Sequence, residues 1–249
     1  IRVQANKHNK ILQTAITRYT RGLVTIDLIG AVHIADRAYY QALNKNFQGY
    51  QVVLFEMVGG ERLGKGRPMP KVTQGDGSLG FLGNAYQKAQ ELLKLSGQKD
   101  GIDYTAENLI HADLTLDEFK TLQAERKESI LGFALKQALV SSPSKNQPSS
   151  AAFLLALLRK DSNRLKSMMI DTLGEGDTNI AKLTGDNVII SDRNLKCLAV
   201  MQDQINAGKN KMGIFYGAAH FPDMEKRLID LGFQKAEQTW LDAWVIPNH

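Results

Sequence analysis

A seven-residue motif, G-A-x-H-x-x-D, occurs twice in the chain, as GAVHIAD from Gly30 and as GAAHFPD from Gly217. Both copies follow an apolar run and precede an amphipathic helical pattern, so His33 and His220 each come where a predicted strand passes into a predicted helix. This is the edge at which α/β sheets place ligand sites. We therefore expect both histidines in one functional site, with the aspartate that ends each copy capping the following helix.

A carboxylate ends the next predicted strand. Glu56 stands in the run VVLFEMV, and a buried charge is costly unless it is paired or binds a cation. The plain alternative is a glutamate that faces water or pairs with an arginine such as Arg62. Together with His33 and His220, Glu56 resembles a divalent-metal site with open positions for water and substrate. Such an ion would acidify its water and polarise a carbonyl group.

Three further residues are candidates for the same chemistry. His111 and Asp113 come just before a capping box made by Thr115 and Glu118, and they would complete the metal shell or act as acid and base. The alternative is a surface histidine and an aspartate near the cap. Arg193 begins a predicted helix, where a basic charge opposes the dipole. This position favours a role in binding a substrate carboxylate or stabilising an oxyanion.

The elements that must position these residues come from both ends of the chain, with a long helical stretch between them. We expect one domain over residues 1–249, with a helical insertion at about 79–185. The expected fold class is α/β, a three-layer α/β/α sandwich with a mostly parallel central sheet. Expected strands cover 3–16, 18–29, 51–57, 187–191, 212–216 and 240–246, and expected helices cover 36–47, 79–96, 115–127, 130–140, 151–169, 192–207 and 223–231. The Ser- and Pro-rich segment 141–150 divides two helices or forms a flap.

Several common catalytic motifs are absent or incomplete. The segment Gly59–Lys65 satisfies most of a phosphate-binding loop, but Gly66 stands where a magnesium-binding Ser or Thr belongs. The glycines of Gly75–Gly80 follow no convincing strand, which argues against a dinucleotide site. The chain has no GxSxG nucleophile elbow, no HExxH helix and no paired CxxC. Serine-hydrolase and zinc-finger chemistry are therefore not predicted.

Composition narrows the class of protein. The 43% hydrophobic share supports a folded core, and no apolar run is long enough for a transmembrane span. Cys197 is the only cysteine, so an intrachain disulfide is excluded and a packed thiol is expected. The formal net charge is +5, but the basic residues are scattered along the chain and interleaved with acidic ones, which argues against nucleic acid as a partner.

The sequence leaves open whether the protein forms a homodimer. The first residue is Ile1, which suggests a processed form, so an exported or membrane-anchored location is an expectation.

The ordered set of motifs resembles the TraB/PrgY/TIKI (GumN-like) family. Its pattern has two GxxH motifs, a glutamate on the strand after the first, and an Arg-Asn pair before the second, which Gly30–His33, Glu56, Arg193-Asn194 and Gly217–His220 match in order. The resemblance implies a fold similar to erythromycin-esterase (EreA) and ChaN-like proteins. For the animal members it also implies a manganese- or cobalt-dependent, membrane-tethered protease; zinc is the third metal that we consider for this site. On this basis His33, Glu56 and His220 are metal ligands or catalytic groups, and Arg193 is a site residue.

The sequence supports three hypotheses about function. The first is a metal-dependent hydrolase of peptide or amide bonds, in which Arg193 steadies the oxyanion and Asp113 or His111 moves protons. The second is a non-catalytic protein that binds a peptide or haem iron, with Phe215, Tyr216 and Phe221 lining an apolar slot. The third is a metal-free, esterase-like hydrolase with His33 as general base. The expected substrate is a peptide or a small amide or ester.

Overall fold

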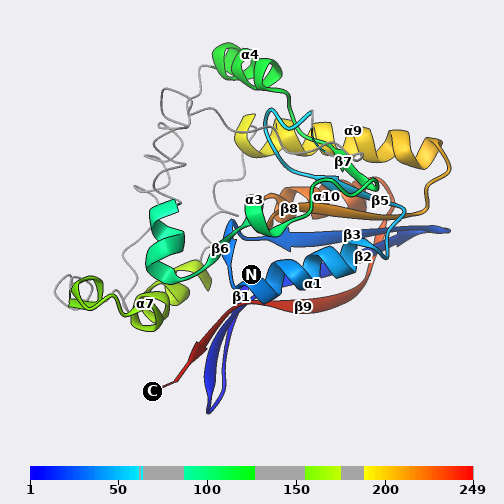
Figure 1. The fold of residues 1–249 in the computed structure, drawn as a ribbon. Coiled ribbons are helices and arrows are strands. Elements are labelled where there is room, and N and C mark those ends of the chain that lie inside the picture. The colour runs from blue at the N-terminus through cyan, green and yellow to red at the C-terminus, as the bar shows by residue number, and fades with distance from the viewer. Residues whose placement is uncertain (62, 64–86, 127–154, 175–187, 249) are drawn as a thin grey trace.

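A central sheet is assembled from both ends of the chain, as expected (Figure 1). The computed structural model describes residues 1–61, 63, 87–126, 155–174 and 188–248. Among them, seven strands form the main sheet in the order β1-β2-β3-β8-β5-β7, with β9 paired to β2. These strands are β1 (Arg2–Ala5), β2 (Asn9–Arg21), β3 (Val24–Ala31), β5 (Val52–Phe55), β7 (Leu109–His111), β8 (Lys211–Gly217) and β9 (Gln234–Pro247).

Four neighbouring strands, β3, β8, β5 and β7, run parallel. Their carboxyl ends therefore meet at one edge, where ligand sites of α/β sheets lie. Strands β1 and β9 extend the sheet by antiparallel pairing with β2, which is itself antiparallel to β3. The expected α/β fold with a mostly parallel central sheet and flanking helices is thus confirmed. A short second sheet pairs β4 (Ile34–Ala35) with β6 (Ser96–Gly97).

Helices cover both faces of the main sheet, which gives three layers (Figure 1). Helix α1 (Arg37–Phe47) and helix α7 (Ser162–Gly174) contribute Leu43 and Leu165 to one buried cluster. Helices α9 (Arg193–Asn206) and α10 (Phe221–Asp230) contribute Met201 and Leu228 to a second cluster. Tyr216 of β8 packs into the second cluster, while its neighbour Phe215 packs into the first. Strand alternation therefore builds both cores from the same run of residues.

Two further helices lie near the strand ends. Helix α3 (Gln98–Gly101) follows β6, and helix α4 (Leu116–Arg126) follows β7. The predicted capping box is confirmed at α4, because Thr115 Oγ1 accepts from the N–H of Glu118 at 3.1 Å and the Glu118 carboxylate accepts from the N–H of Thr115 at 2.8 Å. Cys197 is buried as expected, and burial raises the pKa of its thiol.

Three predicted elements differ from the structure. The expected strand at 187–191 is a π-helix, η1 (Val188–Asp192), that leads directly into α9, so its apolar residues join a helix end rather than the sheet. The expected strand at 3–16 is divided between β1 and β2, and the boundary expected before residue 18 lies instead at Gly22, whose φ of +57° is suited to a tight turn. The expected helix at 151–169 is interrupted at Lys160, where φ is +52°, before α7 begins. The predictions for 130–140 and 141–150 lie outside the described residues.

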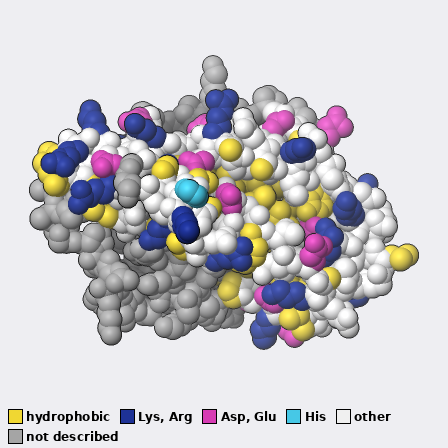
Figure 2. Space-filling view, turned by 90° about the horizontal axis from the view of Figure 1, so that it is seen from below, with side chains coloured by type: hydrophobic (Ala, Val, Ile, Leu, Met, Phe, Trp, Pro, Cys, Tyr) yellow, Lys and Arg dark blue, Asp and Glu magenta, His cyan; other side chains and the backbone are white. Residues whose placement is uncertain are grey.

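The surface carries mixed charge. Figure 2 shows lysine and arginine side chains spread over one face and interleaved with acidic ones. No helix in the described part of the chain is long and apolar enough to cross a membrane. The exclusion of nucleic acid, the homodimer and the cellular location stay predictions.

Candidate functional site

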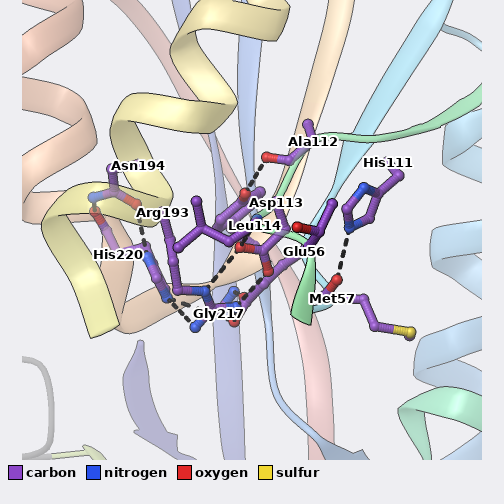
Figure 3. Close-up of polar contacts among 12 residues, drawn as sticks. Glu56, Met57, His111, Ala112, Asp113, Leu114, Arg193, Asn194, Gly217 and His220 are labelled. Atoms are coloured by element: carbon purple, nitrogen blue, oxygen red, sulfur yellow. Dashed lines mark hydrogen bonds and ion pairs between the residues drawn. The ribbon is translucent and has the colours of Figure 1, made fainter. Parts of the chain in front are cut away.

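The candidate residues come together at the carboxyl ends of three parallel strands (Figure 3). Glu56 follows β5, Asp113 follows β7 by two residues, and Gly217 ends β8. Arg193 is the first residue of α9, and His220 ends the short 3₁₀ turn η2 (Ala218–His220) before α10. The parallel register of β7, β5 and β8 therefore places these groups side by side.

Arg193 is at the centre of the cluster. Its Nη2 donates to Glu56 Oε1 at 2.6 Å and to Asp113 Oδ2 at 2.7 Å, and its Nε donates to Asp113 Oδ1 at 2.9 Å. The side chain of Asp113 is fully buried. Burial alone lowers the pKa of Arg193, but the carboxylates of Glu56 and Asp113 outweigh it and raise that pKa above its ordinary value. Arg193 is therefore a permanent cation and exchanges no proton.

Glu56 is an ionised carboxylate with both oxygens in use. Oε1 binds Arg193, and Oε2 accepts the backbone N–H of Gly217 at 2.5 Å. Burial raises the pKa of Glu56, but the positive charge of Arg193 above all, with the imidazoles of His220 and His33 nearby, holds that pKa well below its usual range. A Cβ at Gly217 would lie only 3.2 Å from Oε2. The glycine of the second motif thus permits the carboxylate to approach the backbone.

His220 is buried beside this ion pair. Its Nε2 lies 3.4 Å from Arg193 Nη1 and 3.5 Å from Glu56 Oε1. Its Nδ1 lies 2.7 Å from Asn194 Oδ1. The ring also packs edge-on against Tyr216, with 5.2 Å between centroids. The structure therefore brings the predicted residues Glu56, Arg193 and His220 together.

His33 is exposed at the rim of the site. Its Nδ1 lies 3.2 Å from Gln98 Oε1, and Gln98 Nε2 donates to the hydroxyl of Tyr104 at 3.0 Å. Its charge is one of the causes that lower the pKa of Glu56, so the imidazole is within electrostatic reach of that carboxylate. His33 thus belongs to the same site but faces solvent.

His111 turns away from the ion-pair cluster. Its Nε2 donates to the carbonyl oxygen of Met57 at 2.7 Å (Figure 3). Its ring packs edge-on against Phe55. Asp113 does join the cluster, but as the partner of Arg193, and Oδ1 also accepts the N–H of Leu114 at 2.8 Å. The acid–base roles predicted for His111 and Asp113 stay predictions.

The two motif aspartates do not cap helices as expected. Asp36 occupies the N-cap position of α1 without a capping hydrogen bond, because its Oδ2 accepts the N–H of Val245 at 2.7 Å and its Oδ1 lies 3.3 Å from Lys166 Nζ. Asp223 is the third residue of α10, and its Oδ2 accepts from Asn194 and Arg227. Both carboxylates instead join segments that are distant in sequence.

Sequence reasoning missed two carboxamides that orient the histidines. Asn194 was noted only as the neighbour of Arg193, and Gln98 was not singled out. Each places an amide oxygen next to the Nδ1 of a motif histidine, at 2.7 Å for His220 and 3.2 Å for His33. The adjacency of Asn194 to Arg193 was the only signal for either.

A metal ion does not fit the side chains as they stand. The guanidinium of Arg193 already lies next to Glu56 Oε1 and His220 Nε2, on two of the three residues that were predicted to bind the ion. The other oxygen of Glu56 accepts from Gly217. Within the described ranges, no group of three or more His, Cys, Asp or Glu side chains is arranged to hold an ion. The predicted manganese, cobalt or zinc site therefore receives no support from this geometry.

The predicted apolar slot beside the histidines is also incomplete. Phe215 and Tyr216 are fully buried within the two cores, and only Phe221 is partly exposed. Comparisons of the chain with protein-family models, with curated proteins and with solved structures find no match. The argument about function therefore depends on the site itself.

Proposed function

We propose that this chain is a metal-free hydrolase of ester or amide bonds, with His33 as its general base. The observation that carries the proposal is an exposed imidazole, His33, which follows the end of β3 beside Gly217, the residue whose N–H binds the ionised and mostly buried carboxylate of Glu56. A neighbouring carboxylate stabilises the imidazolium that forms when histidine removes a proton. Arg193 contributes by keeping Glu56 ionised and in place.

The reaction consumes one water molecule. Nε2 of His33 removes a proton from water, and the hydroxide attacks the carbonyl carbon of the substrate. The ester C–O or amide C–N bond then breaks, and the imidazolium gives its proton to the leaving alkoxide or amine. Gln98 supports this role because its amide nitrogen donates to Tyr104, so its oxygen accepts from Nδ1–H of His33 and Nε2 is left as the basic atom.

The metal-dependent form of the same hydrolase stays a prediction from the TraB/PrgY/TIKI resemblance. It would require the Arg193 guanidinium to leave Glu56 before an ion could bind there. Likewise, the oxyanion and substrate-carboxylate roles of Arg193 stay predictions, since the hydrogen bonds described above direct it to Asp113, Glu56 and His220. Peptide or haem binding without catalysis is the remaining alternative.

Hydrolysis of a panel of chromogenic esters and peptide anilides, with and without a strong chelator, tests the proposal. We expect activity that survives chelation and that falls by about 10²–10⁴-fold in His33→Ala, the usual contribution of a general base. His8→Ala is the matched control, because His8 is an exposed histidine on the turn between β1 and β2.

Three results would contradict the proposal. Loss of activity on chelation and recovery with manganese, cobalt or zinc would favour the metal-dependent enzyme. Full activity in His33→Ala would show that His33 is not the general base. Absence of hydrolysis across the panel, with saturable binding of peptide or haem, would favour the binding protein. Calorimetric titration with the three metal ions gives an independent reading, and the proposal expects no stoichiometric site.

A further inference from the structure

The carboxamide of Asn194 has a fixed orientation. Its side chain is fully buried, and its Nδ2 donates both to the backbone oxygen of His220 at 3.1 Å and to Asp223 Oδ2 at 2.8 Å. An amide nitrogen has two donors and no acceptor. Since both acceptors lie on the side of Nδ2, Oδ1 is the atom that faces His220 Nδ1, at 2.7 Å.

We infer that Asn194 is a positioning residue that keeps the proton of neutral His220 on Nδ1 and makes Nε2 a hydrogen-bond acceptor. An amide oxygen only accepts, so the Nδ1 atom that it contacts must donate. In neutral imidazole one nitrogen donates and the other accepts. The lone pair of Nε2 therefore faces the ion pair between Arg193 and Glu56.

The guanidinium of Arg193 requires a hydrogen-bond acceptor at Nε2 of His220. Nη1 lies 3.4 Å from Nε2, and a guanidinium can only donate. The opposite tautomer would turn an N–H of His220 toward the N–H groups of Arg193. With Nε2 as acceptor, Asp113, Glu56 and His220 surround the guanidinium with three acceptors and fix its direction toward Glu56.

A second set of contacts holds Asp223, the carboxylate to which Asn194 donates. Asp223 Oδ2 accepts from Arg227 Nε at 2.7 Å, and Arg227 Nη2 donates to Ser191 Oγ at 2.9 Å. These residues come from α10 and η1, so the turn that carries His220 is connected to both helices. The aspartate that ends the second motif thus acts on the histidine through Asn194.

The two motif histidines consequently differ in role. His33 is exposed and reaches substrate, whereas only 4% of the His220 side chain is exposed and it acts through Arg193. The kinetic part of this inference rests on the proposed hydrolase. The tautomer of His220 does not, because it is measured without substrate.

Nitrogen-15 NMR of histidine-labelled protein tests the tautomer at a pH well above the ordinary imidazole pKa of about 6.5. We expect the Nδ1–H form for His220 in the wild type and a shift toward Nε2–H in Asn194→Ala. His111 is an internal reference for the Nε2–H form, because its Nε2 donates to a carbonyl oxygen. The His220→Ala spectrum assigns the signal.

Kinetics supply the second readout. Asn194→Ala is expected to lower kcat by about 10²-fold with little change in KM, since a displaced Arg193 no longer orients Glu56. Asn194→Asp combined with Asp223→Asn keeps an acceptor at Nδ1 and an amide–carboxylate pair between the two positions, and should restore the Nδ1–H form and most of kcat. Asn206→Ala, an exposed asparagine on the same helix, is the control.

The outcomes separate this inference from the proposed function. A wild-type His220 with its proton on Nε2, or on both nitrogens, overturns the inference, as does Asn194→Ala with unchanged tautomer and kcat. If Asn194→Ala does not fold, the paired variant still decides, because loss of the Nδ1–H form there contradicts the assignment. If no variant hydrolyses any substrate but the tautomers are as expected, the positioning role stands and the hydrolase fails.

Discussion

Arg193 Nη2 lies 2.6 Å from Glu56 Oε1, so the first residue of helix α9 is hydrogen-bonded to the carboxylate that follows strand β5. A cation at a helix N-terminus is unfavourable by itself. Here Glu56 and the buried Asp113 provide the compensating negative charge. The pair therefore joins the parallel sheet to the helix layer, and its removal should affect both stability and activity.

Substitution of Arg193 by methionine should be costly. It leaves the buried carboxylate of Asp113 and the mostly buried one of Glu56 without their cation, and breaking a buried ion pair typically costs about 3–5 kcal/mol in the free energy of unfolding. Urea denaturation measures this loss. The exposed Arg159→Met is the control, and adding Asp113→Asn to Arg193→Met should recover part of the stability. A loss below about 1 kcal/mol would mean that the pair resembles an exposed one.

Acid should weaken the fold through Glu56. Its pKa in the folded protein is lowered below the unfolded value of about 4.3. The stabilising contribution is therefore complete above the unfolded pKa and is lost as the pH falls through the folded pKa. In denaturant titrations between pH 7 and pH 2, Glu56→Gln should show a shallower acid loss than the wild type. The exposed Glu107→Gln should keep the wild-type slope; equal slopes for Glu56→Gln and wild type would refute the assignment.

The two motif glycines should respond differently to alanine. In Gly30→Ala the new Cβ would meet the backbone oxygen of Ala15 at 3.1 Å, which cannot move without disturbing β2. We expect a loss of about 1–3 kcal/mol, as for overpacking. In Gly217→Ala the Cβ would meet Glu56 Oε2 at 3.2 Å, so the carboxylate shifts and hydrolysis falls more than stability. Thermal unfolding and kcat together check this contrast, and the reverse order would disprove it.

Lys166 should fix helix α7 to the first motif. Its Nζ lies 3.3 Å from Asp36 Oδ1, and only 7% of its side chain is exposed. Lys166→Met removes this contact, so amide hydrogen exchange in α7 should become faster while exchange in α9 is unchanged. Lys226→Met, on the exposed face of α10, serves as the comparison. Unchanged protection of α7 would show that its apolar contacts are sufficient.

The sequence predicted the framework of the site well. Apolar runs followed by helical patterns located β3, β5 and β8, and the carboxyl ends of parallel strands meet by geometry. That rule placed Glu56 and the two histidines at one edge. The unusual basic residue at the start of a helix drew attention to Arg193, and its side chain lies in the cluster.

The partners of these residues were not predictable in the same way. Periodicity indicates which face a side chain occupies, but not which distant group it contacts. Asp36 therefore appeared to be a cap, although its partners Lys166 and Val245 lie more than a hundred positions away in the chain. The strand predicted at 187–191 failed for a related reason, since its β-branched residues stand directly before α9 and take helical geometry.

Strand β9 also determines when the site can form during synthesis. It contacts the turn that carries His33, because Trp244 Nε1 donates to the oxygen of Ile34 at 2.8 Å and the oxygen of Ala243 accepts from Asp36 at 2.9 Å. The Ile34–Trp244 contact spans 210 positions. Such long-range contacts form late because loop closure must precede them. A nascent chain whose β9 has not left the ribosome therefore lacks these two contacts to the turn that carries His33.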